Sequence, residues 1–289
     1  MKAKTSQHSN AFSLFQYQTR RKTAKKMAAT FHIRSNSFPS RQHPQAAHVE
    51  EQLCRLRSSE ATSTSSSSSI GQRLTDLQDL HDSLEKLLRL PFTQQTLDKK
   101  AVEKLLDGSL RILDLCNMTK DALSQTKECL NEIQSILRRK RGDLSSEVKK
   151  YLASRRSLKK SFQKVLKSLE ATNGDESLTV FGEAEGLTIS LFDSLFSFVS
   201  ESTTPSGKWS LVSKLMNHKR VACEAQTANE FAKVDSAFQS FTENKSENTL
   251  KMEDVKRLES CVQDLEEGIE SLFKSLMKYR VSLLNTFGH

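Results

Sequence analysis

The chain has 289 residues, with 44 Lys and Arg against 35 Asp and Glu, and therefore a formal charge of +9. The excess lies at one end, because residues 1–49 hold nine basic residues and no acid, which leaves residues 50–289 neutral. This distribution argues against a basic globular nucleic-acid-binding domain, and no nucleic-acid partner is expected.

The composition predicts an all-α protein. Only four prolines and nine glycines occur, and three of the prolines precede residue 92, so long helices are favoured over sheet. We expect an elongated multi-helix bundle with long antiparallel helices and a disordered N-terminal tail. The five cysteines are odd in number and widely spaced, which predicts reduced thiols and a cytoplasmic, intracellular location.

Residues 1–47 are predicted to be a disordered basic tail, because they lack periodic apolar residues. The segment RRKTAKK, from Arg20 to Lys26, precedes Met27, which is typical of a protein start. Three readings of residues 1–26 therefore stay open: an N-terminal extension, a transit peptide for a plastid or mitochondrion, or a nuclear import patch.

The tail also contains a candidate phosphorylation motif. Arg34, Ser35, Ser37 and Pro39 fit the pattern R-S-x-S-x-P, which 14-3-3 proteins bind when its second serine is phosphorylated. A phosphate on Ser37 would add about two negative charges that an arginine-lined groove could bind. The alternative is that a serine-rich tail produces such a string without any function.

Residues 48–69 are predicted to form a short amphipathic helix, VEEQLCRLR, followed by a flexible serine-rich linker from Ala61 to Ser69. Residues 70–289 are predicted to form the helical bundle domain. Its expected helices are residues 70–88, ended by Pro91, residues 99–139, residues 146–169, a buried core helix around residues 187–199, a short helix at Trp209 and a helix containing residues 231–241.

The last predicted helix has the most regular apolar pattern of the chain. Its a and d positions are all apolar: Val255, Leu258, Val262, Leu265, Ile269, Leu272, Leu276, Tyr279 and Leu283. β-Branched residues at a and leucine at d favour a parallel two-stranded coiled coil, whereas the flanking positions lack the charges that a dimer seam needs. The pattern therefore leaves two alternatives: packing inside the same chain, or contact with a second copy or another protein.

A run of positive charge extends over residues 138–167, which hold twelve Lys and Arg against two acids. A basic amphipathic helix could lie on an anionic membrane surface, bind calmodulin, or pair with the acidic last helix of the same chain. The candidate basic surface consists of Arg138, Arg139, Lys140, Arg141, Lys149, Lys150, Arg155, Arg156, Lys159 and Lys160.

No motif for catalysis or for cofactor binding occurs in the chain. Only His81 and His218 lie within the predicted bundle away from the ends, and no cysteine pair has zinc-ligand spacing. We therefore expect a protein that is not an enzyme and has no cofactor.

Several segments carry a resemblance to a known family, among them FHIRSNSFPSRQHP, LQDLHDSLEKLLRLPFTQQ, ALSQTKECLNEIQSILRRKRG, KWSLVSKLMNHKRVAC and LESCVQDLEEGIESLFKSLMKYRVSLLN. From Met27 to His289 the chain resembles the plant-specific domain-of-unknown-function family 241, which is related to the BYPASS proteins. This resemblance implies a role in root and shoot development, and it supplies no catalytic residues. The expected function is a non-enzymatic regulatory or interaction module, and the alternative is a peripheral membrane protein that uses the basic helix.

Overall fold

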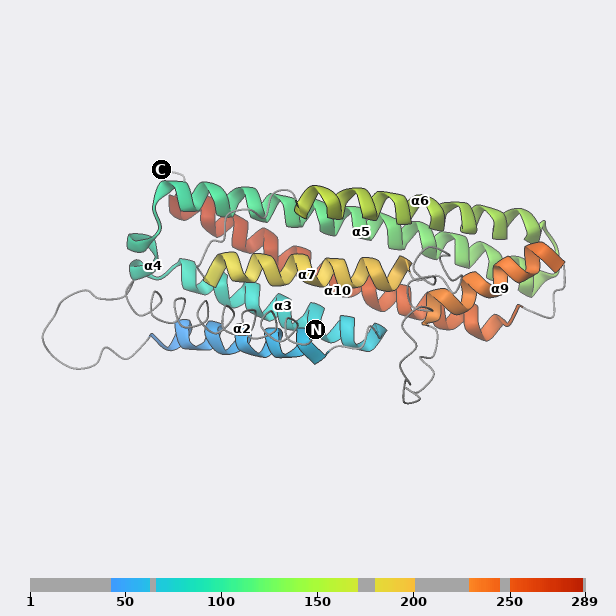
Figure 1. The fold of residues 1–289 in the computed structure, drawn as a ribbon, viewed down its shortest axis with the longest axis horizontal. Coiled ribbons are helices and arrows are strands. Elements are labelled where there is room, and N and C mark those ends of the chain that lie inside the picture. Colours follow the sequence, from blue (N-terminus) through green and yellow to red (C-terminus); the bar gives the residue numbers. More distant parts are fainter. Residues whose placement is uncertain (1–42, 63–65, 171–179, 201–228, 245–249, 288–289) are drawn as a thin grey trace, which may run out of the picture. The chain divides into compact units, whose positions relative to one another are not determined.

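The computed structural model describes residues 43–62, 66–170, 180–200, 229–244 and 250–287. Contacts divide the chain into two units, residues 1–42 and residues 43–289, and every described residue belongs to the second unit. Within the described ranges all regular structure is helical, which confirms the all-α prediction (Figure 1). The eight helices in these ranges are α2 (Pro44–Thr62), α3 (Ser67–Leu88), α4 (Pro91–Thr96), α5 (Lys99–Arg139), α6 (Leu144–Glu170), α7 (Val180–Ser200), α9 (Glu230–Asn244) and α10 (Met252–Phe287).

Local signals in the sequence set the ends of the longest helix, α5, which has the predicted bounds. The Asp98 side chain accepts a hydrogen bond from the backbone N–H of Ala101 at 2.7 Å, so that it caps the first turn. At the other end Lys140 has a φ of 50° and Gly142 a φ of 120°. These left-handed residues stop the helix and turn the chain into α6.

Helix α10 lies between α3 and α5, which Figure 1 shows running along its length. It is antiparallel to α5, because Glu270 pairs with Lys120 while the earlier Glu259 accepts a hydrogen bond from the later Gln134 at 2.5 Å. It is parallel to α3, because Gly268 lies against Leu74 while Lys278 lies 3.8 Å from Asp82. The last helix therefore has both a parallel and an antiparallel neighbour within its own chain.

All nine a and d side chains of α10 are buried, none being more than 5% exposed. The first of the two alternatives for this helix is thus what the structure shows: the seam packs inside the chain. The a and d residues of α10 are typical of a parallel coiled coil, and α3 takes the place of the parallel partner helix. It runs parallel to α10 and contributes leucines such as Leu74 and Leu77, both almost fully buried.

The predicted N-terminal boundaries need correction. Helix α2 begins at Pro44 rather than after residue 47, and it packs on the bundle through Val49, Leu53 and Leu56, which are buried. Helix α3 begins at Ser67, inside the predicted serine linker, because the Ser66 hydroxyl accepts a hydrogen bond from the backbone N–H of Ser69. Serine favours the N-cap position, so part of the run starts a helix instead of a flexible link.

Two further predictions concern the middle of the chain. The apolar segment around residues 187–199 is confirmed as a buried core helix, and α7 extends it to Val180–Ser200. None of the helices in the described ranges has the length and apolar character needed to cross a membrane. Helix α4 was not predicted, and the expected helix at Trp209 lies outside the described residues.

Candidate functional site

Helix α6 presents a cationic face that points away from the core. Val148, Tyr151 and Phe162 are buried on its inner side. The lysines and arginines recur three, four or seven residues apart on the opposite side, as the helical repeat requires. We call this surface the outer face of α6; its exposed members are Lys149, Lys150, Arg156, Lys159, Lys160 and Lys164.

The four basic residues of the preceding turn extend this charge toward the end of α5. Arg138, Arg139, Lys140 and Arg141 are all exposed, as predicted for the basic surface. Arg138 and Arg139 occupy the last turn of α5, where cations interact favourably with the helix dipole. Arg138 also donates a hydrogen bond to the Gln134 side chain at 2.7 Å.

Arg155 was predicted to belong to the basic surface, and this prediction is wrong. The structure places Arg155 in the core, with 8% of its area exposed. Its guanidinium pairs with Asp235 of α9 at 3.1 Å, donates to the backbone oxygen of Val199 at the end of α7, and lies over the Phe231 ring at 4.6 Å. Arg155 is placed inward because it is four residues from Tyr151 and seven from Phe162, on the buried side of the helix.

A second polar group completes this buried cluster. The Tyr151 hydroxyl donates to Asp235 at 2.8 Å, and burial, with the nearby Asp235 charge, raises the pKa of Tyr151 well above its ordinary value. Tyr151 therefore stays protonated and remains a donor. Asp235 thus receives hydrogen bonds from two residues of α6, which fixes the rotation of that helix and keeps its other cations turned outward.

Among the described residues the cations of α6 do not pair with the acidic last helix, so the structure does not support this alternative for the basic helix. In the described ranges the acids of α10 pair with α5 instead, Glu266 with Lys127 and Glu270 with Lys120. The hydrogen bond from Lys120 lowers the pKa of Glu270. These acids pair with lysines of α5, and none of the ion pairs among the described residues joins α6 to α10.

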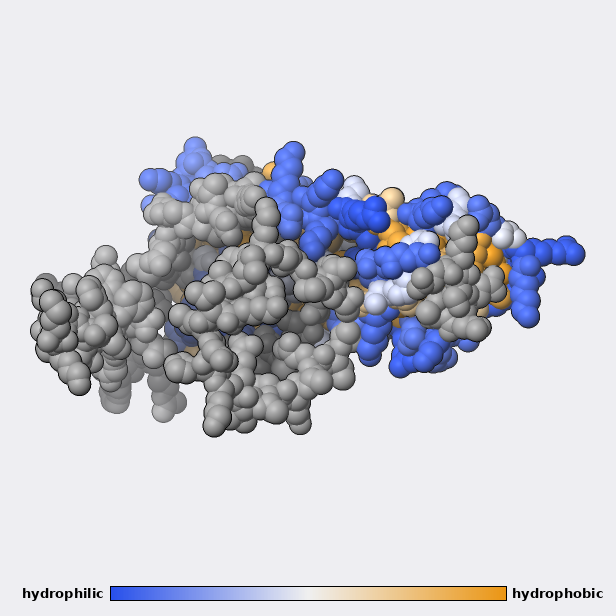
Figure 2. All heavy atoms as spheres, turned by 45° about the vertical axis from the view of Figure 1, so that its right-hand side comes forward, coloured by the Kyte–Doolittle hydropathy of each residue, from blue (hydrophilic) through white to orange (hydrophobic). Residues whose placement is uncertain are grey.

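The surroundings of the outer face are polar. Lys150 pairs with Glu147 in its own helix at 2.6 Å, and Lys159 donates to the Ser200 backbone oxygen at 3.4 Å. In the parts that Figure 2 leaves uncovered by grey atoms, hydrophilic side chains project outward beside smaller hydrophobic areas. No large hydrophobic side chain is exposed on residues 144–165, the part of α6 whose side chains the structure describes, so this part of the face is charged without an exposed apolar group.

A shallow cavity lies at one edge of the outer face. Its volume is about 240 Å³, and Arg156, Lys159 and Gln239 line it together with the buried Arg155–Asp235 pair. Because Arg155 neutralises Asp235, Arg156 and Lys159 give the cavity a positive charge. It is the place on α6 best suited to an acidic side chain or a phosphate group.

The surroundings of His81, one of the two histidines of the predicted bundle, do not suit a general base. It is 3% exposed, its Nε2 atom lies 3.0 Å from the Thr188 hydroxyl, and burial lowers its pKa to about 4 against the weak opposing effect of Asp82. The cavity that it lines with Glu185 and Tyr279 has a volume of only about 10 Å³, enough for one water molecule. His218 and Cys223 lie outside the described residues.

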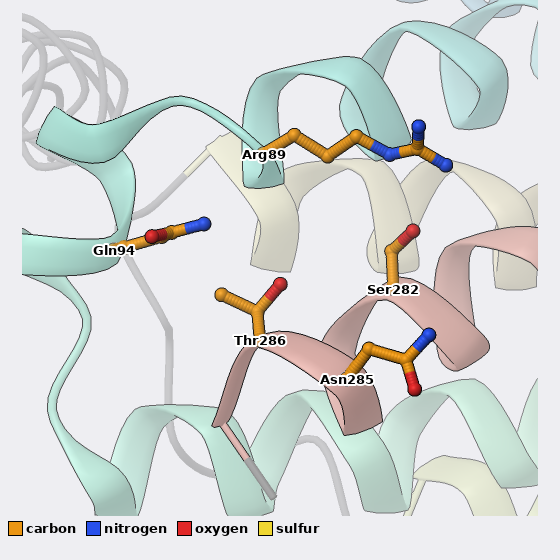
Figure 3. A pocket seen from close by; sticks show the side chains of 5 residues that line it. All are labelled: Arg89, Gln94, Ser282, Asn285 and Thr286. Atoms are coloured by element: carbon orange, nitrogen blue, oxygen red, sulfur yellow. The ribbon is translucent and has the colours of Figure 1, made fainter. Parts of the chain in front are cut away.

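The remaining sites are structural or shallow. Burial raises the pKa values of the Cys116 and Cys261 thiols to about 12, so both behave as core residues. The described residues contain no group of three or more His, Cys, Asp and Glu that could hold a metal ion. Figure 3 shows a further cavity, of about 340 Å³, whose only charged lining residue is Arg89; the others are Gln94, Ser282, Asn285 and Thr286.

The phospho-motif of Arg34, Ser35, Ser37 and Pro39 lies outside the described residues. Sequence reasoning found most of the basic surface, but it missed Asp235, Phe231 and Tyr151, which orient it. One signal was present: Arg155 falls in the same helical register as Tyr151 and Phe162.

Comparison with known proteins gives a single family. A family model described as "Protein BPS1" matches residues 73–286, which include α4, α5, α6, α7 and α9, most of α3 and all but the last residue of α10. No curated protein and no solved structure matches the chain.

Proposed function

The chain belongs to the BPS1 protein family, and from that membership we propose that it is a non-enzymatic regulatory or interaction module acting in plant root and shoot development, with the outer face of α6 as its partner-binding surface. Family membership supports the developmental setting, consistent with the resemblance to BYPASS-related plant proteins. The surface is proposed on structural grounds alone.

One observation carries the choice of surface: among the described residues, the exposed cations of α6 other than Lys150 have no acidic partner, although the chain from residue 50 onward is neutral. Two acids of the last helix, Glu266 and Glu270, pair with α5 instead. A partner with a complementary acidic surface would be attracted by this face and oriented by it. Arg156 and Lys159, beside the 240 Å³ cavity, would receive its central carboxylate or phosphate.

The test is proximity labelling in plant tissue with the wild-type chain and the triple variant Lys149→Glu, Arg156→Glu and Lys160→Glu. We expect the variant to lose partners that the wild type labels, because reversed charge repels an acidic surface. A matched control is Lys233→Glu, Lys251→Glu and Lys256→Glu, three exposed lysines outside α6. Equal sets of partners for both variants would contradict the proposal.

Peripheral membrane binding is the second candidate, and the six exposed cations of α6 favour it. Each lysine or arginine near an anionic bilayer contributes about 1 kcal/mol, whereas residues 144–165 of α6 expose no large apolar side chain, which argues against insertion of this part of the helix. Co-sedimentation with phosphatidylcholine vesicles, with and without phosphatidylserine, tests this function. Binding that does not depend on phosphatidylserine would remove it.

The tail provides an independent route to a partner. We propose that Ser37, when phosphorylated, binds a 14-3-3 protein, and the support for this is the motif in the sequence. A peptide of residues 30–42 is measured with and without phosphate on Ser37. Equal affinity of the two forms for a 14-3-3 protein would dismiss the motif.

A further inference from the structure

Exposed hydrophobic side chains are concentrated at one place on the bundle. Among the described residues only five large hydrophobic side chains are exposed, and four of them lie on α5 and α10: Leu110 at 47%, Met277 at 40%, Val281 at 46% and Leu284 at 47%. Single exposed apolar residues are normal on a protein surface, whereas a contiguous group marks an interaction site.

The register of the two helices places these side chains together. Met277, Val281 and Leu284 are four and three residues apart, so they follow one side of α10. Arg280, in their midst, donates hydrogen bonds to the Leu106 backbone oxygen and, at 2.9 Å, to the Ser109 hydroxyl, which brings Leu110 beside them. We call Leu110, Met277, Val281 and Leu284 the outer stripe.

The outer stripe is separate from the heptad seam of the same helix. The seam residues Leu276, Tyr279 and Leu283 are at most 5% exposed and face α3 and α5 within the chain. The stripe residues alternate with them and stay open to solvent. A pattern of apolar residues at both sets of positions gives α10 an inner and an outer apolar surface.

Charges of opposite sign border the outer stripe. Asp107 and Asp114, both exposed, follow the α5 edge, as helical spacing from Leu110 requires. Lys274 and Lys278, each 66% exposed, follow the α10 edge. Each lysine pairs with an acid of its own chain, Lys274 with Glu270 at 3.4 Å and Lys278 with Asp82 at 3.8 Å, but both side chains are exposed enough to approach a further acid.

The outer stripe and its charged borders form a surface that is complementary to the same surface of a second copy. In a pair of chains related by a two-fold axis parallel to the helices, α5 of each copy lies over α10 of the other. Asp107 and Asp114 of one copy then face Lys274 and Lys278 of its partner, while the two outer stripes cover each other. Interfaces of this kind, in which the same patch serves both subunits, are the commonest in homo-oligomers.

We infer that the outer stripe is a dimer interface between two copies of this chain, paired about a two-fold axis parallel to α5 and α10. The inference does not depend on the function proposed for α6, since the two surfaces share no residue. The heptad seam of α10 is buried inside the chain, so the site of self-association is a different surface of the same helix.

Sedimentation equilibrium of the full chain tests the interface. We expect the wild type to be a dimer at about 10 µM, and the double variant Val281→Asp and Leu284→Asp to be monomeric, with a dissociation constant at least about 100-fold higher. Both positions are exposed, so circular dichroism should show an unchanged helical content. A wild type that is monomeric at about 100 µM, or a variant that still dimerises equally well, would overturn the inference.

Charge exchange tests the predicted orientation. The variant Lys274→Glu and Lys278→Glu, and the variant Asp107→Lys and Asp114→Lys, should each dimerise more weakly than the wild type, because each places like charges opposite one another. An equimolar mixture of the two should regain dimerisation as a mixed pair, because opposite charges then face each other at both charged edges. The control variant Lys149→Glu and Lys160→Glu, on α6, should dimerise like the wild type. A mixture no tighter than its components would rule out the two-fold arrangement, since only α5 over α10 brings these edges together.

Discussion

The two long charged helices α10 and α6 differ in whether their charged side chains are paired within the chain. On α10 the acids lie at the rim of the contact with α5 and pair with its lysines, Glu266 with Lys127 and Glu270 with Lys120. On α6 most cations point to solvent, and a single one, Arg155, pairs inside the core. Whether a charged side chain pairs within the chain or points to solvent depends on its position relative to the apolar face of its helix. It does not depend on the number of charges on the helix.

The two arrangements differ in what they contribute to stability. Rim pairs such as Lys127–Glu266, whose side chains are 26% and 21% exposed, remain in contact with solvent. Partly exposed pairs contribute about 0–1 kcal/mol, whereas removing one partner of a buried pair costs about 3–5 kcal/mol, because the other charge is left unpaired in the core. The region around α6 and α9 should therefore be the more sensitive to single substitutions.

The largest expected effect comes from Arg155→Met. This change leaves Asp235 buried with only Tyr151 as a donor, and we expect the free energy of unfolding to fall by about 3–5 kcal/mol. Urea denaturation followed by circular dichroism measures it. The neighbouring Arg156→Met, which removes an exposed cation, should change the value by less than about 0.5 kcal/mol.

A second substitution separates the charge from the packing at this site. In the double variant Arg155→Met and Asp235→Leu, no unpaired carboxylate remains, so stability should recover by at least half of the loss. A double variant no more stable than Arg155→Met would show that the contacts of the guanidinium with Phe231 and Val199, rather than the pair with Asp235, hold α6 in place.

The side of the core formed by α3, α7 and α10 should make the free energy of unfolding depend on pH. His81 has a pKa of about 4 in the folded protein, below its value of 6.5 when unfolded, so its neutral form is favoured by folding. Its contribution is present above pH 6.5 and is lost as the pH falls toward 4. We expect a loss of about 2 kcal/mol between pH 7 and pH 5, measured by urea denaturation at both values.

His81→Gln is the control for this effect, because glutamine can bond to Thr188 but does not titrate. Asp82, Glu185 and Tyr279 surround the histidine and are retained in the variant. The variant should lose less stability than the wild type between pH 7 and pH 5. An equal loss in both proteins would assign the pH dependence to other groups.

Helices with regular apolar repeats were predictable from the sequence, and buried polar contacts were not. The predicted bounds of α5, residues 99–139, agree with the structure, in which Asp98 caps the start of the helix and left-handed residues follow its end. The inward position of Arg155 depends on Asp235, eighty residues further along the chain, and such a pairing leaves no local signal. The exposure of Leu110, at 47%, also leaves no local signal in the sequence, because it depends on how much of α5 the distant helix α10 covers.

Glycine substitutions sharpen the parallel contact of α3 with α10. A Cβ atom on Gly268 would lie 2.9 Å from the Leu74 Cδ1 atom, whereas none at Gly71 would meet an atom within 4 Å. Alanine stabilises an open helix position by up to about 1 kcal/mol, and crowding in a packed core costs about 1–3 kcal/mol. We expect Gly71→Ala to raise the melting temperature and Gly268→Ala to lower it. If both raised it, the close approach of the two helices at Leu74 would be wrong.

The smallest effect distinguishes the charges at the rim of α10 from those on α6. Glu266→Gln removes the carboxylate that Lys127 contacts, so the free energy of unfolding should fall by about 0.2–1 kcal/mol in low salt. Lys160→Gln removes a cation that lies among other cations and has no acidic partner within the described residues, so it should leave stability unchanged or raise it slightly. Added salt of about 0.5 M should bring both variants closer to the wild type, because it screens attraction at α10 and repulsion at α6 alike. If Lys160→Gln destabilised the protein as much as Glu266→Gln, the cations of α6 would have partners within the chain, and the surface proposed for an acidic partner would already be occupied.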